Sequence, residues 1–319
     1  MLVGFSAYSL RFSAGIWIKS VKEPMDVWNF IEIAREIGAD GIMLDPVFFP
    51  DFTKSTIELI LDRIREENLY IELEACGAEP CYIKKMIDVS SELDSSVLRI
   101  FIGGVNSRHE LGLERWHRRL DMASRQLREI ASYAQEKEVR VAIENHGDVT
   151  ISELLKVLEE VNSEWIGVCY DTGNQIFVLE DPLEAAERIA PYVFTMHIKE
   201  YKLYLCPKGV IVEGCKLFDG DIPNRKIVEI LRKNSPIREK LHLNIEVPLE
   251  RIVVPFLDLK FTENIGRVDG TQLLRILRYT RGKWSEKLSD FESSTDMLRQ
   301  EYENLEISIM RAKEVWGWI

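Results

Sequence analysis

The chain has 319 residues, of which 46% are hydrophobic and 29% are charged, and its formal net charge is -12 at pH 7. This composition is typical of a soluble globular protein. The negative charge argues against nucleic-acid and anionic-membrane partners, because both require a basic surface. No apolar stretch approaches membrane-spanning length, and the first residues do not form a secretory signal. The five cysteines have no paired CxxC spacing, which indicates reduced thiols and a cytoplasmic protein.

Short apolar runs alternate with helical patterns along most of the chain. Eight runs indicate strands, at residues 3–9, 41–45, 70–75, 97–102, 140–144, 166–171, 193–197 and 241–246. Helix starts lie between them, and the clearest are the Thr150–Glu153 capping box and the Asp181–Pro182 pair. Strand–helix alternation predicts a parallel sheet. Eight units without a glycine-rich phosphate loop favour the α/β class with a closed (β/α)8 TIM barrel over a doubly wound sheet.

Two segments exceed what a minimal barrel needs. Residues 201–222 are long for one connection, and a long loop at the carboxyl end of a barrel strand is a candidate lid over the site. We expect the catalytic barrel to span residues 1–282 and a C-terminal helical extension to span residues 283–319, with a helix from 285 to 315. The extension either packs on the barrel or makes a contact in a homo-oligomer.

Titratable residues end the last four predicted strands, and they are Glu144, Asp171, His197 and Glu246. In a barrel these strand ends converge on one mouth. Three carboxylates there repel one another unless a divalent cation binds between them, which predicts a metal site with these four ligands. Oxygen donors with one nitrogen and no sulfur favour Mn²⁺, then Co²⁺ or Mg²⁺, and are compatible with Zn²⁺. The alternatives are carboxylates paired with lysine, a core histidine, and a helix cap at Asp171.

Further polar residues lie close to these strand ends. Alternate residues of a strand share a face, so His146 is expected to face the same way as Glu144, and Lys199 the same way as His197. The candidates for substrate binding are His146, Asn145, Lys199, Asn174 and Arg99. For Arg99 we favour the alternative of a structural ion pair with Glu72 or Glu74. For Lys199 the alternative is an ion pair with Glu246 or Glu200, and for His146 a simply exposed ring.

Four motifs carry a family resemblance: Ile143-Glu-Asn-His-Gly147, Asp171-Thr-Gly-Asn174, His197-Ile-Lys199 and Asn244-Ile-Glu-Val-Pro248. They resemble the metal-site signatures of the xylose isomerase-like TIM barrel superfamily, and more closely those of its sugar phosphate isomerase/epimerase branch. The resemblance covers about residues 1–250 and leaves the rest of the chain uncovered. It implies a metal-binding enzyme of carbohydrate metabolism with a small-molecule carbohydrate substrate.

The resemblance further implies an isomerase or epimerase that transfers a proton next to a carbonyl through a metal-stabilised enediolate. Glu144 and Glu246 carry over as the catalytic acid–base pair. The alternative is a lyase on the same scaffold, which dehydrates an inosose or a dehydroshikimate or cleaves a 3-keto-glycoside. Asn174 and Leu203 replace a histidine and an arginine of many ketose epimerases, and these departures favour the alternative. A non-catalytic sugar-binding barrel is a third reading, against which the two glutamates argue.

Overall fold

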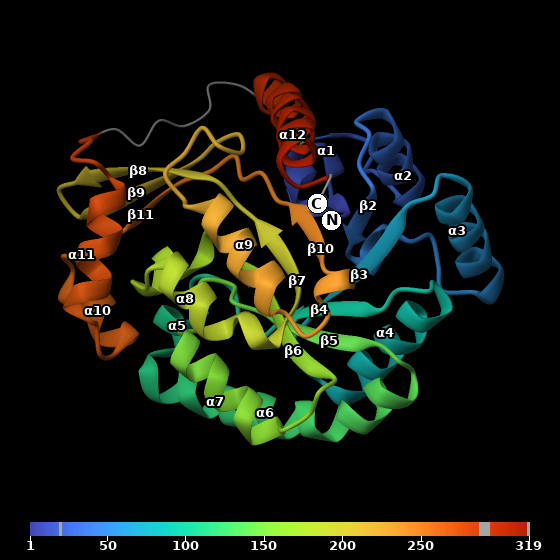
Figure 1. Cartoon of the computed structure of the whole chain (residues 1–319), viewed down its shortest axis with the longest axis horizontal. Coiled ribbons are helices and arrows are strands. Elements are labelled where there is room, and N and C mark those ends of the chain that lie inside the picture. The colour runs from blue at the N-terminus through green and yellow to red at the C-terminus, as the bar shows by residue number, and fades with distance from the viewer. Residues whose placement is uncertain (19–20, 287–293, 318–319) are drawn as a thin grey trace.

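The computed structural model describes residues 1–18, 21–286 and 294–317 (Figure 1). Its centre is a closed barrel of parallel strands in the order β1-β10-β7-β6-β5-β4-β3-β2. These strands are β1 Val3–Ser6, β2 Gly41–Leu44, β3 Tyr70–Cys76, β4 Val97–Phe101, β5 Arg140–Glu144, β6 Ile166–Asp171, β7 Val193–Ile198 and β10 His242–Ile245. The predicted TIM barrel and its eight strands are confirmed. The first strand is shorter than expected, because a 3-10 turn begins at Ala7.

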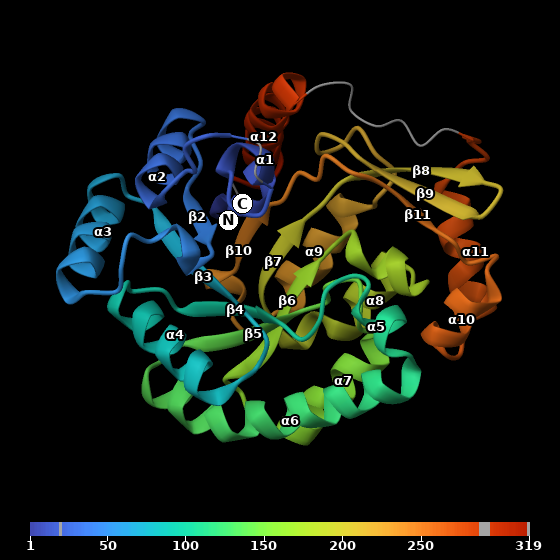
Figure 2. The ribbon, with the colours of Figure 1, turned by 180° about the vertical axis from the view of Figure 1, so that it is seen from behind.

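Helices surround the barrel and cover its outer face (Figures 1 and 2). They are α2 Val27–Glu36, α3 Lys54–Glu66, α4 Pro80–Glu92, α6 Leu113–Glu136, α7 Ile151–Val161, α8 Pro182–Ile189 and α9 Asn224–Asn234, with short helices α1 Arg11–Ala14 and α5 Ser107–Leu111. Both predicted helix starts are confirmed. Thr150 and Glu153 form a reciprocal capping box, and the Asp181 carboxylate accepts a hydrogen bond from the Leu183 amide.

A small second sheet replaces the lid loop that we expected after the seventh barrel strand. The strands β8 Tyr201–Cys206 and β9 Gly209–Gly214 form an antiparallel hairpin, and β11 Arg251–Val254 pairs with β9. The sheet and the helices α10 Leu259–Ile265 and α11 Gly270–Tyr279 lie together at one side of the barrel (Figures 1 and 2). The prediction of a loop was wrong. Residues Tyr201 to Cys206 alternate in polarity and are followed by a Pro-Lys-Gly turn, a pattern that indicates a hairpin.

The long helix α12, Ser294–Trp316, packs against β1 and α1 (Figure 1). The buried Glu301 carboxylate accepts hydrogen bonds from the amides of Phe12 and Ser13, at 2.8 and 2.9 Å, and so fixes this helix to the start of the chain. The domain boundary at residue 283 stays a prediction, and residues 287–293 of the expected helix lie outside the described residues. Within the described part, no helix has the combined length and apolarity needed to cross a membrane.

The barrel interior contains a polar layer beneath the mouth. The buried Glu72 carboxylate accepts hydrogen bonds from the hydroxyl of Thr195 at 2.8 Å and from the amide of Asn244 at 3.0 Å. His242 Nδ1 lies 2.8 Å from the same carboxylate, and its ring stacks on Tyr70. These bonds satisfy groups that burial would otherwise destabilise. Asn244, the first residue of the fourth motif, belongs to this layer.

Candidate active site

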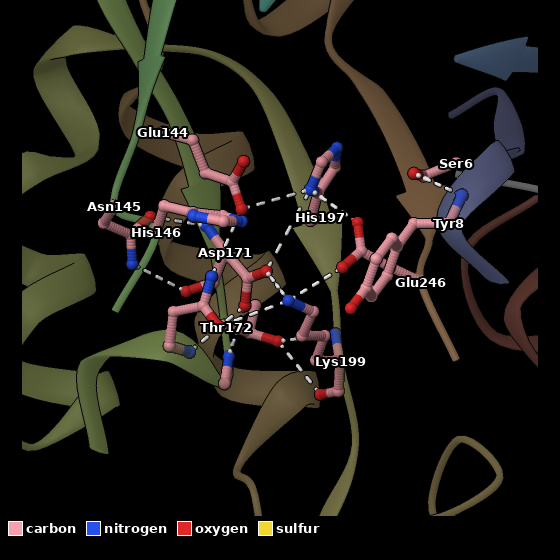
Figure 3. Close-up of polar contacts among 12 residues, drawn as sticks. Ser6, Tyr8, Glu144, Asn145, His146, Asp171, Thr172, His197, Lys199 and Glu246 are labelled. Atoms are coloured by element: carbon pink, nitrogen blue, oxygen red, sulfur yellow. Dashed lines mark hydrogen bonds and ion pairs between the residues drawn. The ribbon is translucent and has the colours of Figure 1, made fainter. Parts of the chain in front are cut away.

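The four predicted metal ligands come together at the carboxyl ends of neighbouring strands (Figure 3). Glu144 ends β5, Asp171 ends β6, His197 lies in β7 and Glu246 follows β10. Nδ1 of His197 lies 3.1 Å from Oε2 of Glu246 and 3.5 Å from Oε1 of Glu144. The same nitrogen lies 4.0 Å from Oδ2 of Asp171. All four side chains are buried, so their charges are strongly coupled.

Three of these residues have the spacing of a metal centre. One donor atom each from Glu144, Asp171 and His197 lies within 4.8 Å of the other two. The backbone amides of Gly173 and Asn174 donate to Oδ1 of Asp171, at 2.9 and 3.1 Å. They leave its other carboxylate oxygen facing the mouth. Two carboxylates and an imidazole nitrogen are a donor set that suits Mn²⁺, Co²⁺, Mg²⁺ or Zn²⁺. The residues therefore fit a divalent cation.

Lys199 is inserted between two of the acidic groups. Its Nζ lies 2.9 Å from Asp171 Oδ2 and 2.7 Å from Glu246 Oε1, and it donates to Asn174 Oδ1 at 3.2 Å. Burial opposes the charge on Lys199, but the two carboxylates raise the pKa of this amine well above its usual value. Burial likewise raises the pKa of Glu246, but Lys199 and His197 outweigh it and hold that pKa well below the ordinary range. The predicted ion pair of Lys199 with Glu246 is therefore present at the mouth itself.

Arg99 also lies at the mouth and holds two carboxylates. Its guanidinium forms ion pairs with Glu144 and, at 3.2 Å, with Glu74, and it lies over the Phe101 ring. The structural pair with Glu74 that we favoured is confirmed. Burial raises the pKa of Glu74 to about 7 although Arg99 opposes the shift. Because Arg99 also touches Glu144, it fixes the orientation of a residue that we expect to react.

His146 lies at the rim and is half-buried. Its ring stacks on Phe101, and Nδ1 lies 3.2 Å from the Gly103 carbonyl oxygen. Burial, together with Arg99 and Lys199, lowers the pKa of His146 to about 3, so the ring is neutral at pH 7. A carbonyl can only accept, so Nδ1 carries the proton and Nε2 is left as an acceptor. The ring can therefore accept a hydrogen bond from a substrate hydroxyl.

Asn145 does not face the mouth, contrary to its predicted role in substrate binding. Its amide nitrogen donates to the Asp171 carbonyl at 2.8 Å and to Gln175 Oε1 at 3.0 Å, and its amide oxygen accepts from the Asp171 backbone N–H at 2.7 Å. Strand alternation explains the error, because the neighbour of an inward-facing residue points outward. Asn145 instead fixes the backbone on which Asp171 stands.

We expect Asn145→Ala to lower the free energy of unfolding by about 2–4 kcal/mol, because it leaves a buried N–H and a buried C=O of Asp171 without partners. Urea denaturation followed by circular dichroism measures this change. Asn234→Ala is the control, because the exposed Asn234 makes one hydrogen bond, to the Ile230 carbonyl. An equal change in the two variants would contradict the role given to Asn145.

Sequence reasoning missed two residues at the mouth, Tyr8 and Arg11. The Tyr8 ring stands beside Glu246 in Figure 3. The Arg11 guanidinium donates to the Tyr8 hydroxyl at 2.7 Å and pairs with Glu250 at 2.9 Å. Both residues follow β1, so their place at the carboxyl end of a barrel strand was the available signal. This signal was missed because the first strand was predicted to end at residue 9, three residues after the end of β1.

A buried carboxyl group, Asp148, lies behind the rim. Neither of its carboxyl oxygens has a hydrogen-bond partner among the described residues. Burial raises the pKa of Asp148 to about 8, although backbone amides and Arg108 oppose the shift. Gly147 precedes it with a φ of 73°, the left-handed turn that glycine favours, and this turn directs Asp148 inward. Asp148 is therefore protonated at neutral pH.

We expect the contribution of Asp148 to the stability of the protein to fall as the pH rises from about 4 to about 8. The folded chain binds this proton more tightly than the unfolded chain, so stability is present at low pH and is lost as the group ionises. Asp148→Asn removes this contribution and is expected to gain about 1–3 kcal/mol over the wild type between pH 5 and pH 9. Urea denaturation of both proteins at several pH values measures the difference. A constant difference would contradict the assignment.

Comparison with known proteins places this fold and site in one family. Residues 31–237 match the model of the xylose isomerase-like TIM barrel, and the chain belongs to that family. A 3-oxo-isoapionate decarboxylase of Pectobacterium atrosepticum is 22% identical over 238 residues, which span 74% of this chain and 82% of the relative.

Solved structures agree in fold. A D-psicose 3-epimerase crystallised in the presence of D-fructose superposes with a TM-score of 0.62 at 12% identity, over 99% of this chain and 100% of the other. The IolI protein with a bound zinc atom has a TM-score of 0.56 at 12% identity, over 88% of this chain and 98% of the other. At such identities these structures show the shared barrel alone.

Proposed function

We propose that this protein is a divalent-metal-dependent enzyme that transfers a proton at the carbon next to the carbonyl of a sugar or sugar-derived keto compound. Isomerase or epimerase activity is the first candidate. The observation that supports it is the placement of Glu144 and Glu246 on either side of His197 at the barrel mouth (Figure 3). A divalent ion held by Glu144, Asp171, His197 and Glu246 would supply Lewis acidity that stabilises negative charge on the substrate oxygens.

Each side chain at the mouth has a separate role in the proposed proton transfer. Glu246 is ionised at neutral pH, since Lys199 and His197 lower its pKa, and it is therefore able to take a proton from the substrate carbon. Glu144, on the other side, would return a proton in an epimerisation. The Lys199 ammonium stands where it stabilises developing oxyanion charge, and His146 would accept a hydrogen bond from a hydroxyl.

A lyase is the second candidate, and the contacts of Arg99 favour it. The guanidinium binds the Glu144 carboxylate, so this carboxylate is not free to exchange a proton on the second face of the substrate, as an epimerase requires. A decarboxylation adds one proton to carbon. An elimination of water takes one proton from carbon and gives one to the leaving hydroxyl, so neither reaction needs acid–base groups on opposite faces of one carbon. The relative from Pectobacterium atrosepticum is a decarboxylase, which supports this candidate.

Incubation of the Mn²⁺-reconstituted protein in ²H₂O with a panel of keto-sugars and keto-acids separates the candidates. Deuterium incorporation with inversion next to the carbonyl, followed by NMR, supports the epimerase. Release of CO₂ with one deuteron on the carbon that carried it, or loss of water from the substrate, supports the lyase. Ligand binding without exchange, CO₂ or water loss across the panel would overturn both in favour of a sugar-binding barrel.

A further inference from the structure

A cavity lies at the end of the barrel opposite the mouth. Its volume is about 720 Å³, and it is bounded by α9, the chain segment before β10, the start of β1 and the end of α12. Leu241 and His242 line it at the beginning of β10, whereas Glu246 follows the other end of that strand. Figure 1 shows the start of the chain beside α12, with α9 nearby. A ligand there would not touch the residues of the candidate active site.

Cations outnumber carboxylates among the residues that line the cavity. The cations are Arg225, Arg232, Lys233, Arg238 and Lys240, against the two carboxylates of Glu229 and Glu239. Arg238 is paired with Glu239 at 3.3 Å. In the described part of the chain, the other four cations have no carboxylate within 4.0 Å, and Arg225 lies over the Phe218 ring at 4.1 Å. Such a concentration of unpaired positive charge is unexpected in a chain whose net charge is -12.

Helix α9 places several of these side chains on the face that lines the cavity. Arg225, Glu229 and Arg232 are separated by four and three residues along α9, so they lie on one helix face. Beneath them the cavity has an apolar floor, where Val228 is 1%, Leu241 2% and Trp316 5% exposed. The volume falls within the range of small-molecule sites, which combine apolar walls with a few polar groups.

We propose that this cavity binds a small phosphorylated molecule with a partly apolar body, of about the size of a nucleoside diphosphate. The guanidinium groups of Arg225 and Arg232 and the Lys233 ammonium would bind the phosphate oxygens, since arginine forks match them geometrically. The apolar floor would hold the uncharged part of the ligand. This site is independent of the proposed catalytic function, and its test requires no activity measurement.

Isothermal titration calorimetry of the full chain at low ionic strength tests the proposal, with pyrophosphate, adenosine diphosphate and adenosine as probes. We expect both phosphorylated probes to bind and adenosine not to bind. Lys233→Glu is expected to weaken binding at least about tenfold, because it replaces a charge-assisted contact with repulsion. Lys226→Glu is the matched control. It makes the same charge change at another exposed lysine of α9, one that does not line the cavity.

Three results would overturn the proposal. The first is no heat of binding from either phosphorylated probe at about 5 mM, a concentration that detects even millimolar affinity. The second is an equal loss in Lys233→Glu and Lys226→Glu, which would indicate non-specific attraction to the helix. The third is binding of adenosine as tight as that of adenosine diphosphate, which would show that the cations are not used. Circular dichroism of each variant confirms that it is folded.

Discussion

Glu246→Gln is expected to lower the turnover rate by about 10³-fold while the protein remains folded. The carboxylate lies at the mouth, 3.1 Å from His197 and 2.7 Å from Lys199, and it is ionised at neutral pH, which is the form that can remove a proton from carbon. A carboxamide keeps the shape but cannot accept the proton, and a general base contributes about 10²–10⁴-fold. The initial rate of deuterium exchange on the best substrate of the keto-compound panel measures the effect.

Glu72→Gln is the matched control for this variant. Glu72 is buried in the polar layer beneath the mouth, and its partners include the Thr195 hydroxyl and His242, which can exchange donor and acceptor roles. We expect this variant to keep its rate within about threefold of the wild type. If Glu246→Gln kept more than a tenth of the wild-type rate, the role of Glu246 as base would be wrong.

The second large effect concerns metal binding. The protein, stripped with a chelator and refilled, is expected to bind one Mn²⁺ per chain, and Asp171→Asn is expected to weaken that affinity by at least about 10²-fold. The amide lacks the negative charge that Mn²⁺ favours, and Asp171 supplies one of the three donor atoms that lie within 4.8 Å of one another. Electron paramagnetic resonance of free Mn²⁺ during a titration measures both affinities.

Asp148→Asn is the control for the metal experiment. It makes the same substitution at a buried aspartate four residues after Glu144, outside the donor group. We expect its Mn²⁺ affinity to match that of the wild type. A wild-type protein that retains no Mn²⁺ after refilling would contradict the metal site. The thermal midpoint of the wild type should also rise with added Mn²⁺, because the ion binds the folded chain.

The sequence predicted with few errors which residues meet at the mouth of the barrel. Glu144, Asp171, His197 and Glu246 each end an apolar run, and the geometry of a closed parallel barrel forces such positions to converge. Regular alternation made the strands visible, and the capping residues Thr150 and Asp181 made the helix starts visible. The family resemblance added the expected roles of these residues, which remain to be tested.

Predictions from local sequence patterns failed where a segment interacts with another segment that is distant in the sequence. The hairpin of β8 and β9 is joined by β11, whose residues lie about forty positions later, and no loop rule foresees that pairing. Asn145 was assigned to the mouth by its proximity in sequence to Glu144, but the pleat of β5 turns it towards the Asp171 backbone. Tyr8 entered the site only because β1 ends earlier than its apolar pattern suggests.

The sequence by itself determined the barrel, the order of its strands along the chain and the four residues of the candidate metal site, because periodicity and strand-end position are local properties. Only the tertiary structure decided which charges neutralise one another. Lys199 between Asp171 and Glu246, Arg99 on Glu144, and the basic cavity at the other end all depend on side chains from different elements. Burial and distance set the strength of such contacts, and neither is fixed until the whole chain is folded.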